Sequence, residues 1–279
     1  MLTRTTHPNG VVTWQSTLLR AAGVPHAFST RIGGVSPAPF DALNLGNPGG
    51  SDVQDSDENL KQNYFRLQLA LGLPLATRAW VSQVHGRMVE LIEPEGEGEY
   101  AETLEPEIRD RYQGQLSADA LVTAQKNVLL TIRVADCFPI LLASETGHIV
   151  AAAHAGWRGV VGNIVGKTVR TLHEAAGVSA APAKLIAAIG PGICAGCFEV
   201  GEEVAAQFEK TGYSAMILRA PGAKPHIDLR AVLVAQLQSA GVSRIDSSPL
   251  CTVENPADFF SHRRDAGRTG RLAAVIAPH

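Results

Sequence analysis

The stretch NVLLTIRVADCFPILLASETGHIVAAAHA, residues 127–155, contains three apolar runs separated by short polar breaks. NVLLTIRV, FPILLA and HIVAAA are each short and aliphatic, and they predict three β-strands. Glu145, Thr146 and Gly147 form a polar turn between the last two runs, which favours an antiparallel hairpin. Runs this apolar are typical of strands with both sheet faces covered. The stretch therefore predicts a sheet buried between other layers.

Further strands and three helices are predicted outside this stretch. ALVT, KLIAAIG and LAAVIAP resemble the first three runs. Residues 55–71 place apolar residues on one helical face, and Asp55 with Glu58 suits a capping box. Residues 161–172 repeat the helical period, and Asp228 is a candidate N-cap for a third helix. The positions on the inward faces predicted for the three helices are Leu60, Tyr64, Leu67, Leu71; Ile164, Val165, Thr168, Leu172; and Leu229, Val232, Leu233, Leu237.

These elements predict an α+β fold in which mixed β-sheets pack together under helices, in α/β/β/α layers. No linker or repeat interrupts the chain, so residues 1–279 are expected to form a single domain. Residues 93–115, EPEGEGEYAETLEPEIRDRYQGQ, combine Pro, Gly and acidic residues without hydrophobic periodicity. This segment is expected to be an exposed acidic insertion, serving either as a solvated face or as a lid.

Composition excludes several classes of protein. A formal net charge of -3 provides no global attraction to nucleic acid or to anionic membranes. The first residues lack the apolar core of a signal peptide, and no run approaches the roughly 20 apolar residues of a membrane span. A cytoplasmic protein is therefore expected, with no signal for its oligomeric state. Four cysteines are too few for a disulfide framework, and the single CxxC pair, Cys194 and Cys197, only weakly favours a redox or structural zinc site.

Three residues are candidate metal ligands: His85 in SQVHG, Cys137 in VADC and His154 in HAGWRG. Two imidazoles and a thiolate suit zinc, and three protein ligands leave a fourth position open, as in catalytic zinc sites. The predicted hairpin would bring Cys137 and His154 side by side, whereas His85 can join them only through the tertiary fold. The competing interpretation is a core thiol, a hydrogen-bonded histidine and an unrelated loop histidine.

Longer motifs carry a resemblance to a known family. TRIGGVS (30–36), LNLG (43–46), SQVHG (82–86), SADALVT (117–123), ADC (135–137), HAGWRG (154–159), IGPGIC (189–194), FEVGEEV (198–204), FFSHRRD (259–265) and GRTGR (267–271) occur in this order. In the wording and order of these motifs, the chain resembles the laccase-domain family over nearly its whole length. Members of that family were long labelled multicopper polyphenol oxidases and are now regarded as purine nucleoside phosphorylases with adenosine deaminase activity.

The resemblance implies a zinc enzyme that cleaves adenosine, inosine or guanosine with phosphate, with S-methyl-5'-thioadenosine as a further substrate. It implies that His85, Cys137 and His154 are the zinc ligands and form the catalytic centre. It also favours Arg158 in HAGWRG as an anion-binding residue beside a helix N-terminus, where backbone N–H groups are unpaired. Arg31 in TRIGGVS and Asn44 in LNLG are weaker candidates for binding phosphate and the nucleoside.

Two other activities remain alternatives at the same residues. A cysteine and two imidazoles also bind copper, but nine histidines without an HxH pair are a poor basis for a multicopper polyphenol oxidase. Alternatively, His154 activates Cys137 as the nucleophile of a cysteine hydrolase or deamidase. Stoichiometric metal binding that disappears when either Cys137 or His154 is replaced favours the zinc enzyme. Activity without metal that is blocked by alkylation of the thiol favours the hydrolase.

Overall fold

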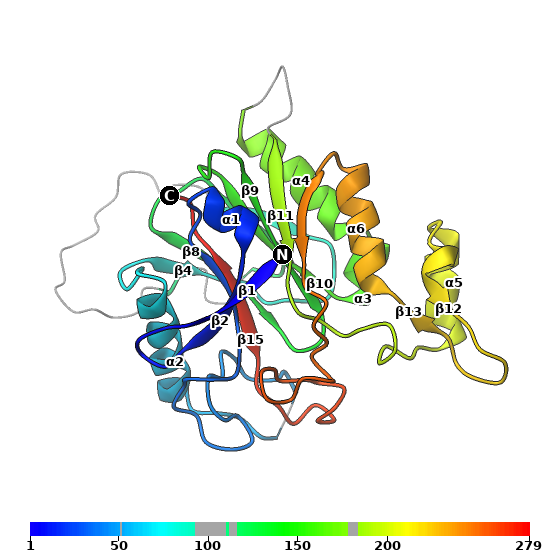
Figure 1. The fold of residues 1–279 in the computed structure, drawn as a ribbon, viewed down its shortest axis with the longest axis horizontal. Coiled ribbons are helices and arrows are strands. Elements are labelled where there is room, and N and C mark those ends of the chain that lie inside the picture. Colours follow the sequence, from blue (N-terminus) through cyan, green and yellow to red (C-terminus); the bar gives the residue numbers. More distant parts are fainter. Residues whose placement is uncertain (51, 93–109, 112–115, 178–183) are drawn as a thin grey trace.

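Two mixed β-sheets lie against one another in the centre of the molecule, with helices on their outer faces (Figure 1). This computed structural model describes residues 1–50, 52–92, 110–111, 116–177 and 184–279. The acidic insertion expected at residues 93–115 lies outside the described residues except for 110–111. The arrangement confirms the α+β class and the α/β/β/α layers.

The first sheet has seven strands in the order β1-β2-β3-β15-β8-β4-β6. Strand β4 runs parallel to β8 and to β6, and all other neighbours are antiparallel. Its strands are β1 (Leu2–Thr6), β2 (Val12–Ser16), β3 (His26–Ser29), β4 (Thr77–Ala79), β6 (Asp110–Arg111), β8 (Val128–Val134) and β15 (Leu272–Ile276).

The second sheet has six strands in the order β14-β11-β9-β10-β7-β5. The β14–β11 and β5–β7 pairs are parallel, whereas the inner pairs are antiparallel. Its strands are β5 (Val89–Ile92), β7 (Ala120–Thr123), β9 (Phe138–Ser144), β10 (Val150–Ala155), β11 (Leu185–Ile189) and β14 (Arg244–Ser247). A separate two-stranded ribbon consists of β12 (Ile217–Leu218) and β13 (His226–Ile227).

The helices cover opposite outer faces of the two sheets. Tyr64 and Leu67 of α2 pack with Val275 of β15 on the seven-stranded sheet, while α4 and α6 cover the six-stranded sheet (Figure 1). Within the described ranges, no helix is both long and apolar enough to cross a membrane. The helices are α1 (Thr17–Ala21), α2 (Asp57–Ala70), α3 (Trp157–Val161), α4 (Ile164–Ala175), α5 (Glu202–Lys210) and α6 (Leu229–Ser239), with a 3₁₀ turn, η1 (Ser214–Met216).

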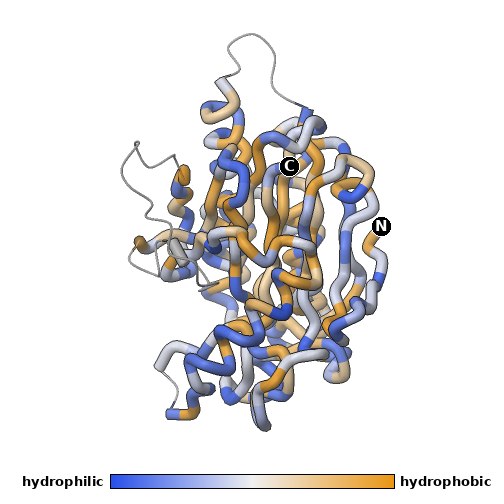
Figure 2. The backbone as a smooth tube through the Cα atoms, turned by 90° about the vertical axis from the view of Figure 1, so that its left-hand side faces the viewer, coloured by the Kyte–Doolittle hydropathy of each residue, from blue (hydrophilic) through white to orange (hydrophobic). Residues whose placement is uncertain are grey.

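The apolar strands alternate between two hydrophobic clusters because successive side chains on a strand point to opposite faces. On β9, Ile140 and Leu142 face the helices, whereas Leu141 and Ala143 face the other sheet. All seven residues of β9 are buried, and the hydrophobic stretches of the chain gather along the central strands in Figure 2. Burial on both faces explains why these runs are continuously apolar instead of alternating with polar residues.

The sequence-based expectations for individual elements are mostly confirmed. All six apolar runs are strands, and the turn at residues 145–147 joins β9 to β10 as an antiparallel hairpin. Asp228 caps α6, since its side chain accepts a hydrogen bond from the Ala231 N–H at 2.9 Å. Strands β1 and β2 were not predicted, because partly exposed polar residues interrupt their apolar pattern, and β3 was not predicted because it has only four residues, two of them polar.

Two helix starts differ from the expectation. Ser56, not Asp55, is the N-cap of α2 and accepts a hydrogen bond from the Asn59 N–H. Asp55 is instead buried and holds Asn44 and Ser36 through its carboxylate. The helix expected from residue 161 is preceded by the five-residue α3, and α4 begins after Asn163 in a left-handed conformation.

Asp246 joins the edges of the two sheets. It lies in β14 of the second sheet, and its carboxylate accepts hydrogen bonds from the Ser16 hydroxyl at the end of β2 and from the Leu18 N–H of α1. The terminal ammonium of Met1 also contacts this carboxylate. Burial would raise the pKa of Asp246, but the hydrogen bonds from Met1, Ser16 and Leu18 lower it below its ordinary value.

Asp246→Asn is expected to destabilise the fold at neutral pH and to have less effect in acid. A carboxyl with a depressed folded pKa contributes stability above its unfolded pKa, near 4, and loses that contribution as the pH falls through the lower folded value. Urea denaturation at pH 7 and pH 3 measures this. A difference between wild type and variant that is equally large at both pH values would contradict the assignment.

Candidate active site

His85, Cys137 and His154 converge on one point although they lie far apart in the sequence. Cys137 immediately precedes β9, and His154 pairs with Pro139 across the β9–β10 hairpin. His85 is in the loop between β4 and β5, which is held by a bridge between Ser82 and Ser117. Each of the three offers one ligand atom, and these atoms all lie within 4.8 Å of one another. The tertiary fold therefore assembles a candidate metal centre.

Asp119, immediately before β7, positions both histidines. Its carboxylate accepts a hydrogen bond from His154 Nδ1 at 2.8 Å and from the backbone N–H groups of His85 and Gly86 at 3.0 and 2.6 Å. Because Nδ1 of His154 is engaged, its Nε2 is the nitrogen that remains for a ligand. A carboxylate behind a histidine in this way is the usual support of a metal-ligating imidazole.

Two backbone features shape the centre. His85 has a φ of 57°, a left-handed conformation that is costly for a residue with a side chain and is often found at functional sites. Gly156 follows His154, and a Cβ at this glycine would lie 3.0 Å from the His85 ring and 3.2 Å from Cys137 Sγ. The absence of a side chain at Gly156 therefore leaves room for the three ligands to meet.

The charges of the centre stabilise one another. Burial would raise the pKa of Cys137, but His154 and His85 outweigh it through their charge and hydrogen bonds and lower this pKa to about 6. Burial would lower the pKa of His154, but the negative charge of Cys137 and the hydrogen bond to Asp119 raise it to about 9. At neutral pH Cys137 is therefore a thiolate, the form that binds metals.

The donor set fits a divalent cation of borderline softness. One thiolate and two imidazoles in reach of one another match metal sites with three protein ligands, in which a fourth position stays open for a reactant. The Asp119 support and the space beside Gly156 agree with this fit.

A cavity of about 550 Å³ opens in front of the three residues. This volume lies within the range of roughly 300–1,000 Å³ that is typical of small-molecule sites. The lining combines apolar and cationic side chains and consists of Asn47, Gly49, Ser82, Gln83, His85, Arg133, Val134, Ala135, Asp136, Cys137, His154, Trp157, Ile193, Phe198, Leu229, His262, Arg263 and Arg271.

Two of the cavity's arginines lie close together. Side-chain atoms of Arg133 and Arg271 both approach Gly46, where a Cβ would lie 2.8 Å from Arg133 Cδ and 3.5 Å from Arg271 Cβ. Burial and the positive charge of Arg133 lower the pKa of Arg271 from its ordinary value. Because two neighbouring guanidinium groups repel one another, an anion bound between them would be stabilised.

A sequence model of the multi-copper polyphenol oxidoreductase laccase family matches residues 25–279. The chain belongs to this family. A purine nucleoside phosphorylase of Deinococcus radiodurans is 42% identical over 261 residues, which cover 93% of this chain and 92% of the relative. A purine nucleoside phosphorylase of Streptomyces coelicolor is 35% identical over 254 residues, which cover 91% and 95%. The resemblance found in the motifs is thereby confirmed.

Solved structures agree with this membership. The hypothetical protein YfiH of Bacillus licheniformis is similar with a TM-score of 0.81 and 26% identity over 99% of both chains. YlmD of Geobacillus stearothermophilus is similar with a TM-score of 0.80 and 30% identity over 99% of this chain and 98% of that one. The layered fold is thus shared along nearly the whole length.

The three residues expected to bind substrate do not line the cavity of this family member. Arg31 donates to the Asp41 carbonyl, pairs with the Asp41 carboxylate and stacks on Phe260. Arg158 is exposed in α3 and stacks on Trp157. Asn44 is fully buried. Their predicted contacts with substrate stay a prediction, and the described geometry gives each of them a local structural role.

Several residues of the site were not singled out by the sequence. Asp119 lies in the SADALVT motif, but only the fold shows that its carboxylate reaches His154 and the His85 loop. Arg133 is the one charged residue in the largely apolar NVLLTIRV run, which was the available signal for a functional position. Arg271 ends the GRTGR motif, and nothing in its spacing connects it with Arg133.

Asp119→Asn is expected to weaken metal binding by about 10–100-fold, as loss of such a supporting carboxylate usually does. An amide has one acceptor oxygen and cannot replace a carboxylate that accepts from three N–H groups. Competition with a chromophoric chelator measures the affinity, and Asp57→Asn on the exposed start of α2 is the matched control. Equal affinities in all three proteins would refute the positioning role.

Asn44→Ala is expected to lower the free energy of unfolding by about 2–3 kcal/mol, because it leaves buried partners unsatisfied. Asn44 donates to Asp55 and accepts from the backbone N–H groups of Gly46 and Arg271. Denaturant unfolding measures the loss, with Gln62→Ala on the exposed face of α2 as control. A variant that is fully stable but binds substrate poorly would instead support direct contact with the nucleoside.

Proposed function

We propose that this protein is a zinc-dependent purine nucleoside phosphorylase that cleaves adenosine, inosine or guanosine with phosphate, and that it also deaminates adenosine. The observation that carries the proposal is one cavity holding both the His85–Cys137–His154 centre and the Arg133–Arg271 pair. The 42% identity to a purine nucleoside phosphorylase supports the same activity. S-methyl-5'-thioadenosine, whose 5' group lacks the hydroxyl, is a further proposed substrate.

Phosphate binding is assigned to Arg133 and Arg271, in place of the Arg31 and Arg158 expected from the motifs. Guanidinium groups pair with phosphate oxygens through two parallel hydrogen bonds, and a dianion relieves the repulsion between the two arginines. Trp157, Ile193 and Phe198 supply apolar surface in the same cavity for the purine and the ribose. Binding both reactants in one cavity brings the attacking oxygen near the anomeric carbon.

His85, Cys137 and His154 would hold zinc, which supplies Lewis-acid polarisation of an oxygen on a bound reactant. The protein's own residues orient this donor set and favour the thiolate of Cys137, and a bound cation would take the place of the proton on His154 Nε2. Asp119 retains the proton of His154 on Nδ1, and the pairing of Cys137 with His154 keeps the sulfur deprotonated. The same donor set suits copper. Neither ligand group found among the described residues has more than two histidines, which disfavours multicopper oxidation.

In phosphorolysis a phosphate oxygen forms a bond to C1' of the ribose while the bond from C1' to the purine nitrogen breaks. The products are ribose 1-phosphate and the free base, which takes up a proton as it leaves. The cavity lining contains three histidines, of which His85 and His154 are candidate ligands. We assign the third, His262, as the donor of that proton. Deamination uses water in place of phosphate, replaces the C6 amino group of adenosine and releases ammonia.

One geometric feature favours a second candidate function. Cys137, His154 and Asp119 form a thiolate–imidazole–carboxylate series, with the Asp119 carboxylate 2.8 Å from His154 Nδ1. The same series activates the nucleophile of cysteine hydrolases. It does not require His85 as a ligand or the two arginines, so activity without metal, blocked by thiol alkylation, separates it from the main proposal.

Zinc-loaded protein is expected to convert adenosine to adenine only when phosphate is present, and to inosine whether or not phosphate is present. Cys137→Ala is expected to lose both products, because it removes a ligand of the centre. Chromatography of the products measures each reaction, and circular dichroism verifies folding of the variant. If folded, zinc-loaded wild type forms neither adenine nor inosine, the proposal is refuted. Activity that survives metal removal would favour the hydrolase.

Arg271→Gln is expected to raise the KM for phosphate by about tenfold or more, since a hydrogen bond to a charged group contributes roughly 1.5–3 kcal/mol. Arg158→Gln, on the exposed surface of α3, is the matched control and is expected to leave this KM unchanged. Initial rates at varied phosphate and saturating nucleoside measure both. If Arg158→Gln raises the KM for phosphate and Arg271→Gln does not, the phosphate-binding arginine is Arg158 of the HAGWRG motif.

A further inference from the structure

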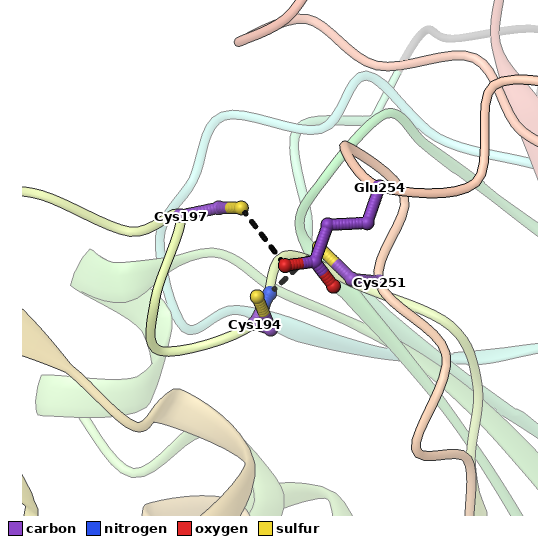
Figure 3. Close-up of side chains that lie close together, drawn as sticks. All are labelled: Cys194, Cys197, Cys251 and Glu254. Atoms are coloured by element: carbon purple, nitrogen blue, oxygen red, sulfur yellow. Dashed lines mark hydrogen bonds between the residues drawn. The ribbon is translucent and has the colours of Figure 1, made fainter.

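A second cluster of metal-binding side chains lies apart from the three ligands described above. Cys194, Cys197, Cys251 and Glu254 each offer one ligand atom, and all four atoms lie within 4.8 Å of one another. Figure 3 shows the three sulfur atoms and the Glu254 carboxylate turned toward a common centre. The sequence reveals only the Cys194–Cys197 pair, and Cys251 with Glu254 joins it from a segment more than 50 residues later.

Two similar turns build the cluster. Cys194 and Cys197 are three residues apart, and the Cys197 N–H donates to the Cys194 carbonyl at 3.1 Å. Cys251 and Glu254 have the same spacing, and the Asn255 N–H donates to the Cys251 carbonyl. A bridge between Gly192 and Cys251 holds the two turns side by side. Pairs of ligands in facing CxxC-type turns are the usual framework of structural zinc sites.

We propose that Cys194, Cys197, Cys251 and Glu254 form a second metal site, which binds zinc with a structural role. Three thiolates with a carboxylate are soft enough to select zinc over magnesium or calcium, and four protein ligands close the coordination shell. The first centre has three ligands and faces the cavity. The second centre therefore has the donor number of a structural site and the first that of a catalytic one.

Distances agree with a cation in this cluster. Tetrahedral zinc with bonds of about 2.3 Å to sulfur separates its ligand atoms by about 3.8 Å, so the side chains need to close by only about 1 Å. Cys251 is buried, and its sulfur accepts a hydrogen bond from the Cys194 N–H at 3.3 Å, which links the two turns directly. Cys197 Sγ also lies 3.7 Å from the Glu254 carboxylate, so that ligands from both turns are close to the separation that a shared metal ion requires.

The cluster is connected to the wall of the cavity. Ile193 and Phe198, which flank the CxxC turn, both line the cavity. Thr252, next to Cys251, donates to Asp136 at 2.6 Å, and Asp136 also accepts from the Arg263 N–H. Asp136 directly precedes Cys137. A metal that joins the two turns would thus hold the apolar wall in place relative to the first centre.

Metal content tests the proposal without reference to catalytic activity. Wild type purified under reducing conditions and loaded with zinc is expected to hold two zinc ions per chain. Cys137→Ala and Cys197→Ser are each expected to hold one, and the double variant none. In a chelator titration, Glu254→Gln is expected to lower the affinity for the second ion only. Glu203→Gln, on the exposed face of α5, is the control.

Cobalt substitution distinguishes the two sites directly. Because the charge-transfer absorption of thiolate–cobalt bonds grows with the number of sulfurs, Cys137→Ala with its three-sulfur site is expected to absorb more strongly than Cys197→Ser. Removal of the second ion is also expected to lower the Tm of Cys137→Ala. One zinc ion in both wild type and Cys197→Ser would overturn the proposal. The proposal would also be overturned if the intact mass, measured under reducing conditions, were lower by two hydrogens than that of the fully reduced chain, because this difference indicates a disulfide.

Discussion

The contact on which the site depends is the buried carboxylate of Asp119. It binds the ring of His154 on β10 and the backbone of the His85 loop, so that one side chain connects three segments that are separate in the sequence. A carboxylate with no exposed surface is stable only when its oxygens accept several hydrogen bonds. The same bonds that satisfy Asp119 therefore hold the two histidines in place.

The layers of the fold explain why the ligands meet at the end of a hairpin. Strands β9 and β10 are buried on both faces, and their antiparallel pairing places Cys137 and His154 at the same end. Polar and charged groups cannot stay inside such a core without partners. They gather where the strands end, at one cavity that also receives Arg133 from β8 and the neighbouring Arg271.

The two proposed metal centres have different roles, one catalytic and one structural. The group with three ligands lines the cavity, and the group with four ligands includes Cys194 and Cys197, which are next in the chain to the lining residues Ile193 and Phe198. Asp136 connects them, because it accepts hydrogen bonds from Thr252 and Arg263 and precedes Cys137 in the chain. The left-handed φ of 85° at Asp136 is where the chain turns from β8 into β9 between these contacts.

The sequence by itself determined the six most apolar strands, the main helices and the layered class, and it singled out His85, Cys137 and His154 as candidate ligands, because apolar periodicity and local motifs are properties of short segments. Residues such as Arg31, Asn44 and Arg158 also lie in motifs, yet motif membership does not distinguish a structural contact from a substrate contact. Only the tertiary structure decided that Asp119 supports the histidines, that Arg133 lies near Arg271, and that Cys251 and Glu254 lie beside the CxxC pair. These are contacts between distant segments, and sequence spacing carries no information on which loop ends meet once two sheets have packed together.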